Sequence, residues 1–155
     1  MKKEIIKTAS ELRQDPVFGD WVLLSPLRRK RHEFNGRIKI LLPKNKCPFD
    51  NLAKFGNAPP VLVYQNIPLR GTTRRAEKDW FLQIIPNKYP AVKHGDCGLI
   101  SQNGLYQSQP SVGFHEIVIL KDHNRYLAQY SPIEIKKILL AYQERYRSLA
   151  KEKCV

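Results

Sequence analysis

The sequence is poor in cysteine and has no long apolar run. Its three cysteines, Cys47, Cys97 and Cys154, stand far apart, and an odd number at wide spacings argues against a disulfide framework and fits a reducing compartment. Residues 1–15 are basic but lack the apolar segment of a secretory signal, and no later stretch approaches the length of a membrane span. These absences predict a cytoplasmic protein that has no membrane partner.

Several well-characterised catalytic motifs are also missing. The chain contains no Ser-His-Asp order, no P-loop, no glycine-rich dinucleotide fingerprint and no paired-carboxylate motif. It has no internal repeat and no low-complexity tract. The enzyme classes that depend on those motifs are therefore excluded.

Acidic residues are scarce relative to basic ones. Lys and Arg total 27 and Asp and Glu total 14, so the formal net charge is +13. A positive field of this kind attracts phosphate-bearing partners, which include nucleic acids and sugar nucleotides alike. With 155 residues and 42% hydrophobic content, the chain can bury the core of one ordinary domain.

The apolar stretches predict several short strands followed by one helix. Turn residues punctuate residues 10–25, which we expect to form a hairpin, and further strands are expected at 61–64, 80–85 and 114–120. We expect residues 94–113 to be irregular. This order predicts an α+β domain rather than alternating βαβ units.

One long helix is predicted from about Pro132 to Lys151. Ser131 can cap it, Pro132 suits its first position, and Glu134 completes a capping box. Residues at helical spacing should form its buried face, namely Ile135, Ile138, Leu139, Tyr142, Tyr146 and Leu149.

The segment Cys47-Pro48-Phe49-Asp50 offers a thiol and a carboxylate three residues apart. Both side chains can turn toward one ion, and zinc accepts both ligand types. The alternative is a thiol beside a solvated turn aspartate. A metal site also needs a distant ligand, for which His115 and His123, at the two ends of one apolar strand, are the candidates.

Two further patterns fit the binding of a nucleotide. Arg28 and Arg31 follow the first hairpin, and guanidinium groups bind phosphate oxygens bidentately; a solvated basic loop is the alternative. Trp80 and Tyr89 flank Pro86-Asn87 and are placed to frame a base, although aromatic residues at strand ends also serve as core.

Taken together, five segments resemble the amino-terminal domain of galactose-1-phosphate uridylyltransferases, a branch of the histidine-triad superfamily. In chain order these segments are ELRQDPVFGDWVLLSPLRRKR, CPFD, APPVLVY, FLQIIPNKYPAV and GFHEIVILKDHNRYLAQYSPIEI. The resemblance spans nearly the whole chain. It implies a histidine-triad-like antiparallel sheet, a half-barrel, with one long C-terminal helix.

The resemblance also implies roles for individual residues. Arg28 and Arg31 would approach the phosphates of the substrate. Phe49, Asn87 and Tyr89 would lie near its uridine end. A zinc ion would be bound by Cys47 and His123, and Asp50 stands where the family has a second cysteine.

The family's reaction is a double displacement. A histidine attacks the α-phosphorus of UDP-glucose, glucose 1-phosphate leaves, and a hexose 1-phosphate such as galactose 1-phosphate captures the uridylyl group. Preorganised arginines lower the barrier by neutralising charge on the phosphoryl oxygens. The partners implied are thus UDP-glucose and a hexose 1-phosphate, in galactose metabolism.

The attacking histidine belongs to a His-x-His-x-Gln motif, which the resemblance places beyond the long helix. None of the four histidines stands in such a motif, namely His32, His94, His115 and His123. We therefore expect residues 1–155 to be the N-terminal substrate- and metal-binding domain without its C-terminal catalytic half. We expect such a chain to be inactive alone until a companion chain completes the site; the partners considered are a separate C-terminal half and a homodimer partner. The alternative is a non-catalytic basic module of the same fold that binds RNA or another acidic partner.

Overall fold

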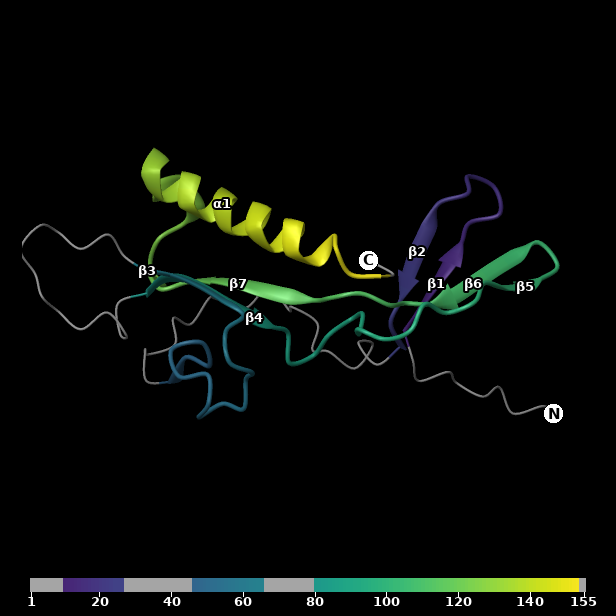
Figure 1. The fold of residues 1–155 in the computed structure, drawn as a ribbon, viewed down its shortest axis with the longest axis horizontal. Helices are drawn as coiled ribbons and strands as arrows, with labels where there is room; N and C mark the ends of the chain where they lie inside the picture. The colour runs from purple at the N-terminus through teal and green to yellow at the C-terminus, as the bar shows by residue number, and fades with distance from the viewer. Residues whose placement is uncertain (1–9, 27–45, 66–79, 154–155) are drawn as a thin grey trace, which may run out of the picture. The chain divides into compact units, whose positions relative to one another are not determined.

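The computed structural model describes residues 10–26, 46–65 and 80–153, which form two compact units. The hairpin unit comprises residues 10–26 and 90–115 with Lys153. The helix unit comprises residues 46–65, 80–89 and 116–152. Each unit contains one antiparallel sheet (Figure 1).

The sheet of the hairpin unit has the strand order β2-β1-β6-β5. Its strands are β1 (Glu11–Gln14), β2 (Trp21–Leu24), β5 (Ser101–Asn103) and β6 (Tyr106–Pro110). The predicted first hairpin is confirmed. The Asp15 carboxylate accepts hydrogen bonds from the main-chain N–H groups of Val17 and Phe18, at 2.7 and 3.3 Å, and Gly19 takes the left-handed conformation that closes the turn.

The expectation of irregular structure over residues 94–113 was wrong, because β5 and β6 form a second hairpin there. The two loop residues are Gly104 and Leu105, and Gly104 has a φ of +60°, as the first position of a tight hairpin turn requires. The strands themselves are polar, with the sequences SQN and YQSQP. They lack the apolar alternation on which strand prediction depends.

The sheet of the helix unit has the order β3-β4-β7. Its strands are β3 (Leu62–Gln65), β4 (Trp80–Pro86) and β7 (Glu116–Leu120), which confirms the three strands predicted for this region. The central strand β4 is buried from Phe81 to Ile85, and Gln83 pairs with Ile119 of β7.

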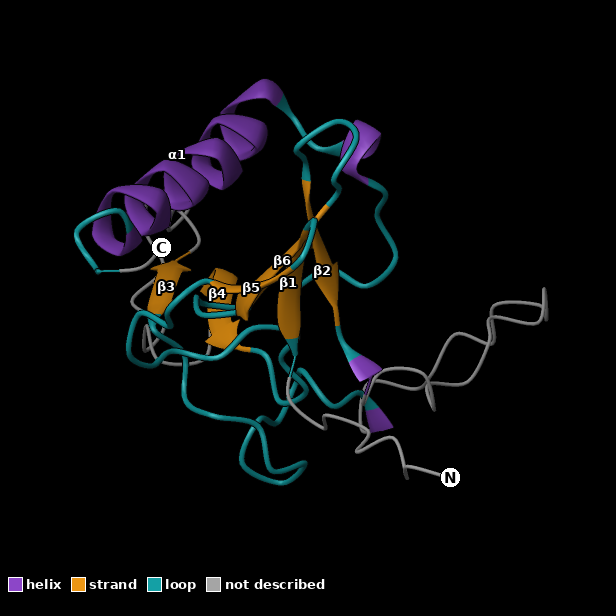
Figure 2. Ribbon diagram, turned by 90° about the vertical axis from the view of Figure 1, so that its right-hand side faces the viewer, coloured by secondary structure: helices purple, strands orange, loops and turns teal. Residues whose placement is uncertain are grey.

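The long helix α1 (Pro132–Leu149) covers one face of this sheet (Figure 2). Its predicted start is confirmed: the Ser131 hydroxyl accepts the N–H of Glu134, and the Glu134 carboxylate accepts the N–H of Ser131. Core residues from β4, α1 and the loop between β7 and α1 pack together, namely Phe81, Leu82, Ile84, Tyr130, Ile138 and Ala141.

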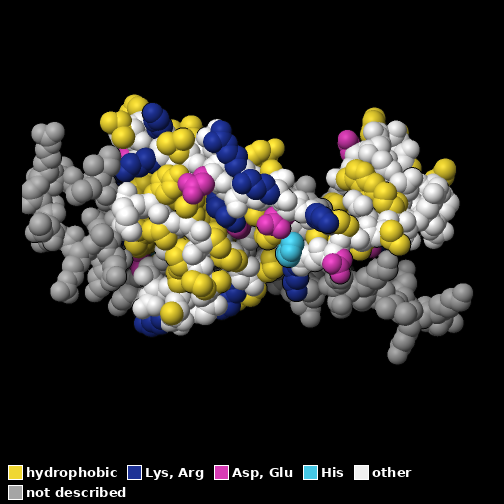
Figure 3. Space-filling view, viewed as in Figure 1, with side chains coloured by type: hydrophobic (Ala, Val, Ile, Leu, Met, Phe, Trp, Pro, Cys, Tyr) yellow, Lys and Arg dark blue, Asp and Glu magenta, His cyan; other side chains and the backbone are white. Residues whose placement is uncertain are grey.

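The buried face of α1 was predicted only in part. Ile138 is buried as expected, but the other fully buried helix residue is Ala141, and Leu139, Tyr142 and Tyr146 are exposed. The small Ala141 side chain lets the helix approach the sheet closely, so the packed stripe is narrow. Hydrophobic and basic side chains therefore lie together on the outer surface over α1 (Figure 3).

The segment that begins at Lys46 lies on the opposite face of the same sheet (Figures 1 and 2). The helix unit thus has three layers: α1, the sheet, and the irregular segment 46–61. Together the two antiparallel sheets and the single long helix confirm the predicted α+β class.

Two further observations bear on the expectations from composition. Among the described residues, no helix is long and apolar enough to cross a membrane. Cys97 is disulfide-bonded, contrary to the expectation that the cysteines stay reduced, whereas Cys47 is a free thiol.

Candidate metal centre

A tight turn brings Cys47 and Asp50 to the same side of segment 46–61. The N–H of Asp50 donates to the carbonyl of Cys47 at 3.4 Å, and the N–H of Phe49 donates to the Cys47 sulfur, also at 3.4 Å. The Cys47 side chain is buried, and Asp50 is partly exposed. The turn thus presents one soft and one hard metal ligand together.

Three side chains hold this segment through its carbonyl groups, two of them from β4 and the residues just after it and one, Asn57, from the segment itself. The Gln83 amide donates to the carbonyl of Phe49 at 3.1 Å, and the Asn57 amide donates to that of Pro48 at 2.9 Å. The Lys88 ammonium donates to the carbonyl of Phe55 at 2.9 Å. In this way the carbonyl groups that lie outside strands and helices still have hydrogen-bond donors.

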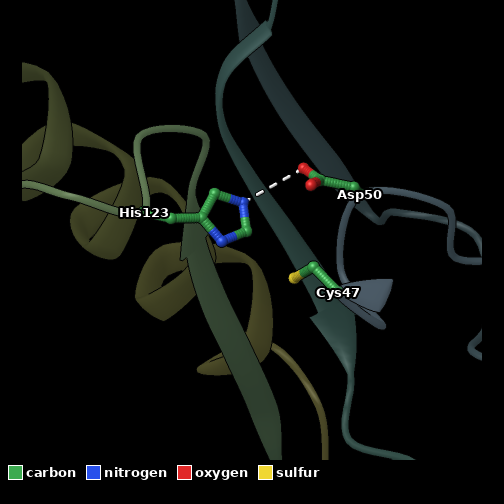
Figure 4. A group of neighbouring side chains, drawn as sticks. All are labelled: Cys47, Asp50 and His123. Atoms are coloured by element: carbon green, nitrogen blue, oxygen red, sulfur yellow. Dashed lines mark hydrogen bonds and ion pairs between the residues drawn. The ribbon is translucent and has the colours of Figure 1, made fainter. Parts of the chain in front are cut away.

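His123 lies in the loop that follows β7. The N–H of Lys121 still donates to Phe81 of β4, and the N–H of Asn124 donates to the Asp122 carboxylate. The loop is therefore held on both sides of His123. This support directs the imidazole toward the turn that carries Cys47 and Asp50 (Figure 4).

A second set of contacts fixes the same loop to the start of α1. The Arg125 guanidinium donates to both Glu134 carboxylate oxygens, at 2.8 and 2.9 Å, and to the carbonyl of Gln129 at 2.7 Å. It also lies 3.9 Å from the centre of the Tyr130 ring. The hydrogen bond from Arg125, aided by that from Ser131, lowers the pKa of Glu134 to about 2.

Three ligand atoms meet where the turn and the loop face each other. The Nε2 atom of His123 lies 3.1 Å from the Oδ1 atom of Asp50, and with the Cys47 sulfur the three donor atoms all lie within 4.8 Å of one another. Donors of these kinds around tetrahedral zinc lie about 3.3–3.5 Å apart. The residues therefore fit a zinc ion after small side-chain movements.

The structure also decides between the two candidate histidines. The Nδ1 atom of His115 accepts the N–H of Ala91 at 3.0 Å within the hairpin unit. His123 lies in the helix unit with Cys47 and Asp50. Of the two, His123 therefore joins the ligand set and His115 has a local structural role.

Comparison with known proteins identifies the family. Residues 1–155 match the family described as "Galactose-1-phosphate uridyl transferase, N-terminal domain". The chain belongs to this family. It is 30% identical over 149 residues to ADP-glucose phosphorylase of Arabidopsis thaliana, a match that covers 90% of this chain and 39% of that protein.

A solved structure of a uridylyltransferase shares the fold, with a TM-score of 0.52 and 27% identity. The match covers 92% of this chain and 36% of that one. The histidine-triad-like α+β fold implied by the sequence agrees with this likeness. In both comparisons the chain spans less than two-fifths of its relative.

All three residues that the family resemblance implies at the uridine end belong to the helix unit. Phe49 lies in the turn that carries Cys47 and Asp50, and Asn87 directly follows β4. The Asn87 side chain accepts the N–H of Tyr89 at 2.9 Å, and Tyr89 is 61% exposed. Gln83, whose amide is hydrogen-bonded to the Phe49 carbonyl, precedes Asn87 by four residues. Four residues of extended chain measure about 13 Å.

Other sequence-based expectations have different outcomes. Arg28 and Arg31 lie outside the described residues. Trp80 begins the seven-residue strand β4, which extends about 20 Å, and Tyr89 lies three residues beyond its end. That the two rings frame one base stays a prediction.

Sequence reasoning did not single out Gln83 or Arg125, although both support the ligand loops. Gln83 was detectable, because it is the one polar residue within the apolar run Trp80–Pro86. Arg125 gave no signal of its own, since a basic residue in a polar loop is ordinary.

Proposed function

We propose that this chain supplies the N-terminal substrate- and metal-binding part of a nucleotidyltransferase, of the type that exchanges the hexose phosphates of UDP-glucose. One observation carries the proposal: in a domain that matches the family from residue 1 to 155, Cys47, Asp50 and His123 come together at the predicted place. The net charge of +13 also favours a phosphate-bearing substrate.

In this proposal Asn87, Tyr89 and Phe49 receive the base and ribose. The exposed ring of Tyr89 offers a face on which a base can stack. The main-chain N–H of Tyr89 is held by the Asn87 side chain. Arg28 and Arg31 bind the phosphates, where paired guanidinium groups neutralise charge that builds on the phosphoryl oxygens.

Zinc would be held by Cys47, Asp50 and His123, where it would cross-link the turn to the loop after β7 and so stiffen the domain. The two segments already face each other without an ion, since the His123 Nε2 atom lies 3.1 Å from the Asp50 Oδ1 atom. The ion thus has a structural role in this proposal.

The covalent step requires a histidine from a His-x-His-x-Gln motif in the portion of the family protein that this chain does not span. Its imidazole nitrogen forms a bond to the α-phosphorus as the bond to glucose 1-phosphate breaks. A phosphate oxygen of the incoming hexose 1-phosphate then attacks the same phosphorus, and the histidine is released. A separate C-terminal half, in the cytoplasm, would supply that motif, because a second copy of residues 1–155 has no His-x-His-x-Gln segment either.

Calorimetric titration with sugar nucleotides tests the proposal. The chain should bind UDP-glucose or ADP-glucose, and the preferred one defines the base, since the Arabidopsis relative is named for ADP-glucose. Asn87→Ala and Tyr89→Ala should each weaken binding about tenfold or more, which corresponds to 1.4 kcal/mol.

Tyr106→Ala is the matched control, because Tyr106 is an exposed tyrosine in the hairpin unit. It should leave binding unchanged. Tight binding of single-stranded RNA that falls steeply between 50 and 200 mM salt, with no binding of either sugar nucleotide, would reject the transferase proposal in favour of the basic module.

A further inference from the structure

The central strand of the helix unit contains one polar side chain among its buried residues. Gln83 is 6% exposed, and its neighbours Leu82, Ile84 and Ile85 are 1% exposed or less. An amide in such a position is unfavourable unless it is hydrogen-bonded. Its partner therefore indicates what the residue does.

The Gln83 amide donates to the carbonyl of Phe49 at 3.1 Å. Phe49 stands between the two ligands of the metal-binding turn, and its own N–H donates to the Cys47 sulfur at 3.4 Å. Phe49 thus has its main chain fixed on both sides, by the ligand sulfur and by the strand beneath. A donor to the sulfur also stabilises negative charge on it, which a metal-bound thiolate carries.

The same residue is linked to the third ligand through the sheet. Gln83 pairs with Ile119 on β7, and His123 follows Ile119 by four residues. Because β4 both holds the turn and aligns β7, the two parts of the ligand set share one rigid support.

We infer that Gln83 is a positioning residue of the metal centre: its amide holds the Cys47–Asp50 turn on β4 so that both ligands face His123 before a metal ion binds. This inference rests on the proposed function. It explains how a centre with aspartate in place of a second cysteine keeps its geometry, since the turn is formed without help from the ion.

A consequence reaches the substrate. The carbonyl that Gln83 fixes belongs to Phe49, which the proposed function places at the base end of the sugar nucleotide. The position of this residue and the geometry of the metal centre are therefore linked through this hydrogen bond.

The first test uses cobalt(II) as the probe, because a cobalt–thiolate bond gives a charge-transfer absorption band. Gln83→Met keeps the length of the side chain and removes the amide. We expect the variant to fold but to bind cobalt 10–100-fold more weakly, as for other groups that orient metal ligands. Gln143→Met is the control, since Gln143 is exposed on α1 and should bind cobalt as the parent protein does.

The second test needs no metal. Alkylation of Cys47 by iodoacetamide, followed by the mass of the Cys47 peptide, reports how well the turn buries the thiol. Loosening the turn in Gln83→Met should speed this reaction about fivefold or more in the metal-free protein. Gln143→Met should leave the rate unchanged.

The outcomes separate the positioning role from the metal centre itself. If the parent protein gives no thiolate–cobalt band, the proposed metal centre fails, and the alkylation rates alone decide the role of Gln83. Equal alkylation rates in the parent and Gln83→Met overturn the inference, as does equal cobalt affinity. Gln83→Glu, which sets a carboxylate against the Phe49 carbonyl, should reproduce the losses; if both variants unfold while Gln143→Met folds, Gln83 is a core residue and the inference is rejected.

Discussion

At the scale of the residue, Asp50 is the candidate ligand that stands where the resemblance predicts a second cysteine. A carboxylate and a thiolate both bind zinc, but thiolates suit this ion better. The carboxylate oxygen lies 3.1 Å from His123, so the position already faces the other ligands. The Asp50 carboxylate therefore already stands where a donor to a shared ion would be needed.

We predict that Asp50→Cys strengthens zinc binding about tenfold or more, since a second thiolate replaces a harder ligand. His123→Ala should weaken binding by at least as much, because the ligand from the loop after β7 is lost. Competition with a chelating dye measures both affinities. Asp96→Cys adds a thiol in the hairpin unit and should not change the affinity; a gain equal to that of Asp50→Cys would refute the assignment.

Some of the candidate ligands could be predicted from the sequence, and others needed the structure. The spacing of Cys47 and Asp50 predicted a shared direction, and a local turn delivers it. The choice between His115 and His123 needed the structure, because both lie near the ends of one strand and only the three-dimensional arrangement distinguishes them. The role inferred for Gln83 could not be predicted, because it rests on a contact with Phe49, 34 positions away in the chain.

At the scale of the element, the loop between β7 and α1 is held by charge. Arg125 binds Glu134 through two hydrogen bonds, and Glu134 also caps α1 by accepting the N–H of Ser131. One carboxylate thus serves both the helix start and the loop that carries His123. The pair lowers the pKa of Glu134 to about 2.

This pKa predicts how stability depends on pH. A carboxyl group whose pKa is lower in the folded than in the unfolded protein stabilises the fold fully above the unfolded value of about 4.5. The stabilisation is lost as pH falls from that value toward about 2. Urea unfolding between pH 6 and pH 2 should therefore show a fall in stability that is smaller in Glu134→Gln.

Glu152→Gln is the matched control, because Glu152 is exposed beyond the end of α1. It should keep the acid-dependent loss of the parent protein. An unchanged pH profile in Glu134→Gln would show that the Arg125 pair does not stabilise the fold.

Elements with strong local signals were predictable, and those without were not. The capping box and the proline at the first position fixed the start of α1, and the apolar run fixed β4. The second hairpin escaped because its strands are polar. The helix face was partly misjudged because the depth of packing depends on the small residue Ala141, which sits at 0% exposure, and not on the largest side chains.

At the scale of the whole molecule, the two units differ in how much they bury. The helix unit contains Leu82, Ile84 and Ile85, the largest fully buried side chains among the described residues. No strand residue of β1, β2, β5 or β6 is buried. Burial of apolar surface is the main source of local stability.

We predict that native-state hydrogen exchange separates the units. Amides of β4 and β7 should exchange about 100-fold or more slowly than those of β1 and β6, because opening the helix unit exposes its core. Mass spectrometry of peptides from each strand measures this difference. Equal protection in both sheets would mean that the units unfold as one.

The family and the class of fold were accessible from sequence because five segments in order carry the resemblance. The division into two units was not, since it reflects how the chain passes from one sheet to the other after Tyr89 and returns at Glu116. The chain crosses between sheets in segments that have no periodic pattern of their own.

Because β4 pairs with β7, the arrangement of the candidate ligands also depends on the number of residues in β7. Neighbouring residues of a strand point to opposite faces, so a slip of one position reverses every side chain. Deleting a single residue from within β7 would leave a strand of similar composition and a helix able to pack. It would nevertheless draw His123 about 3.3 Å along the strand direction, so the domain would keep its architecture while His123 moved away from Cys47 and Asp50.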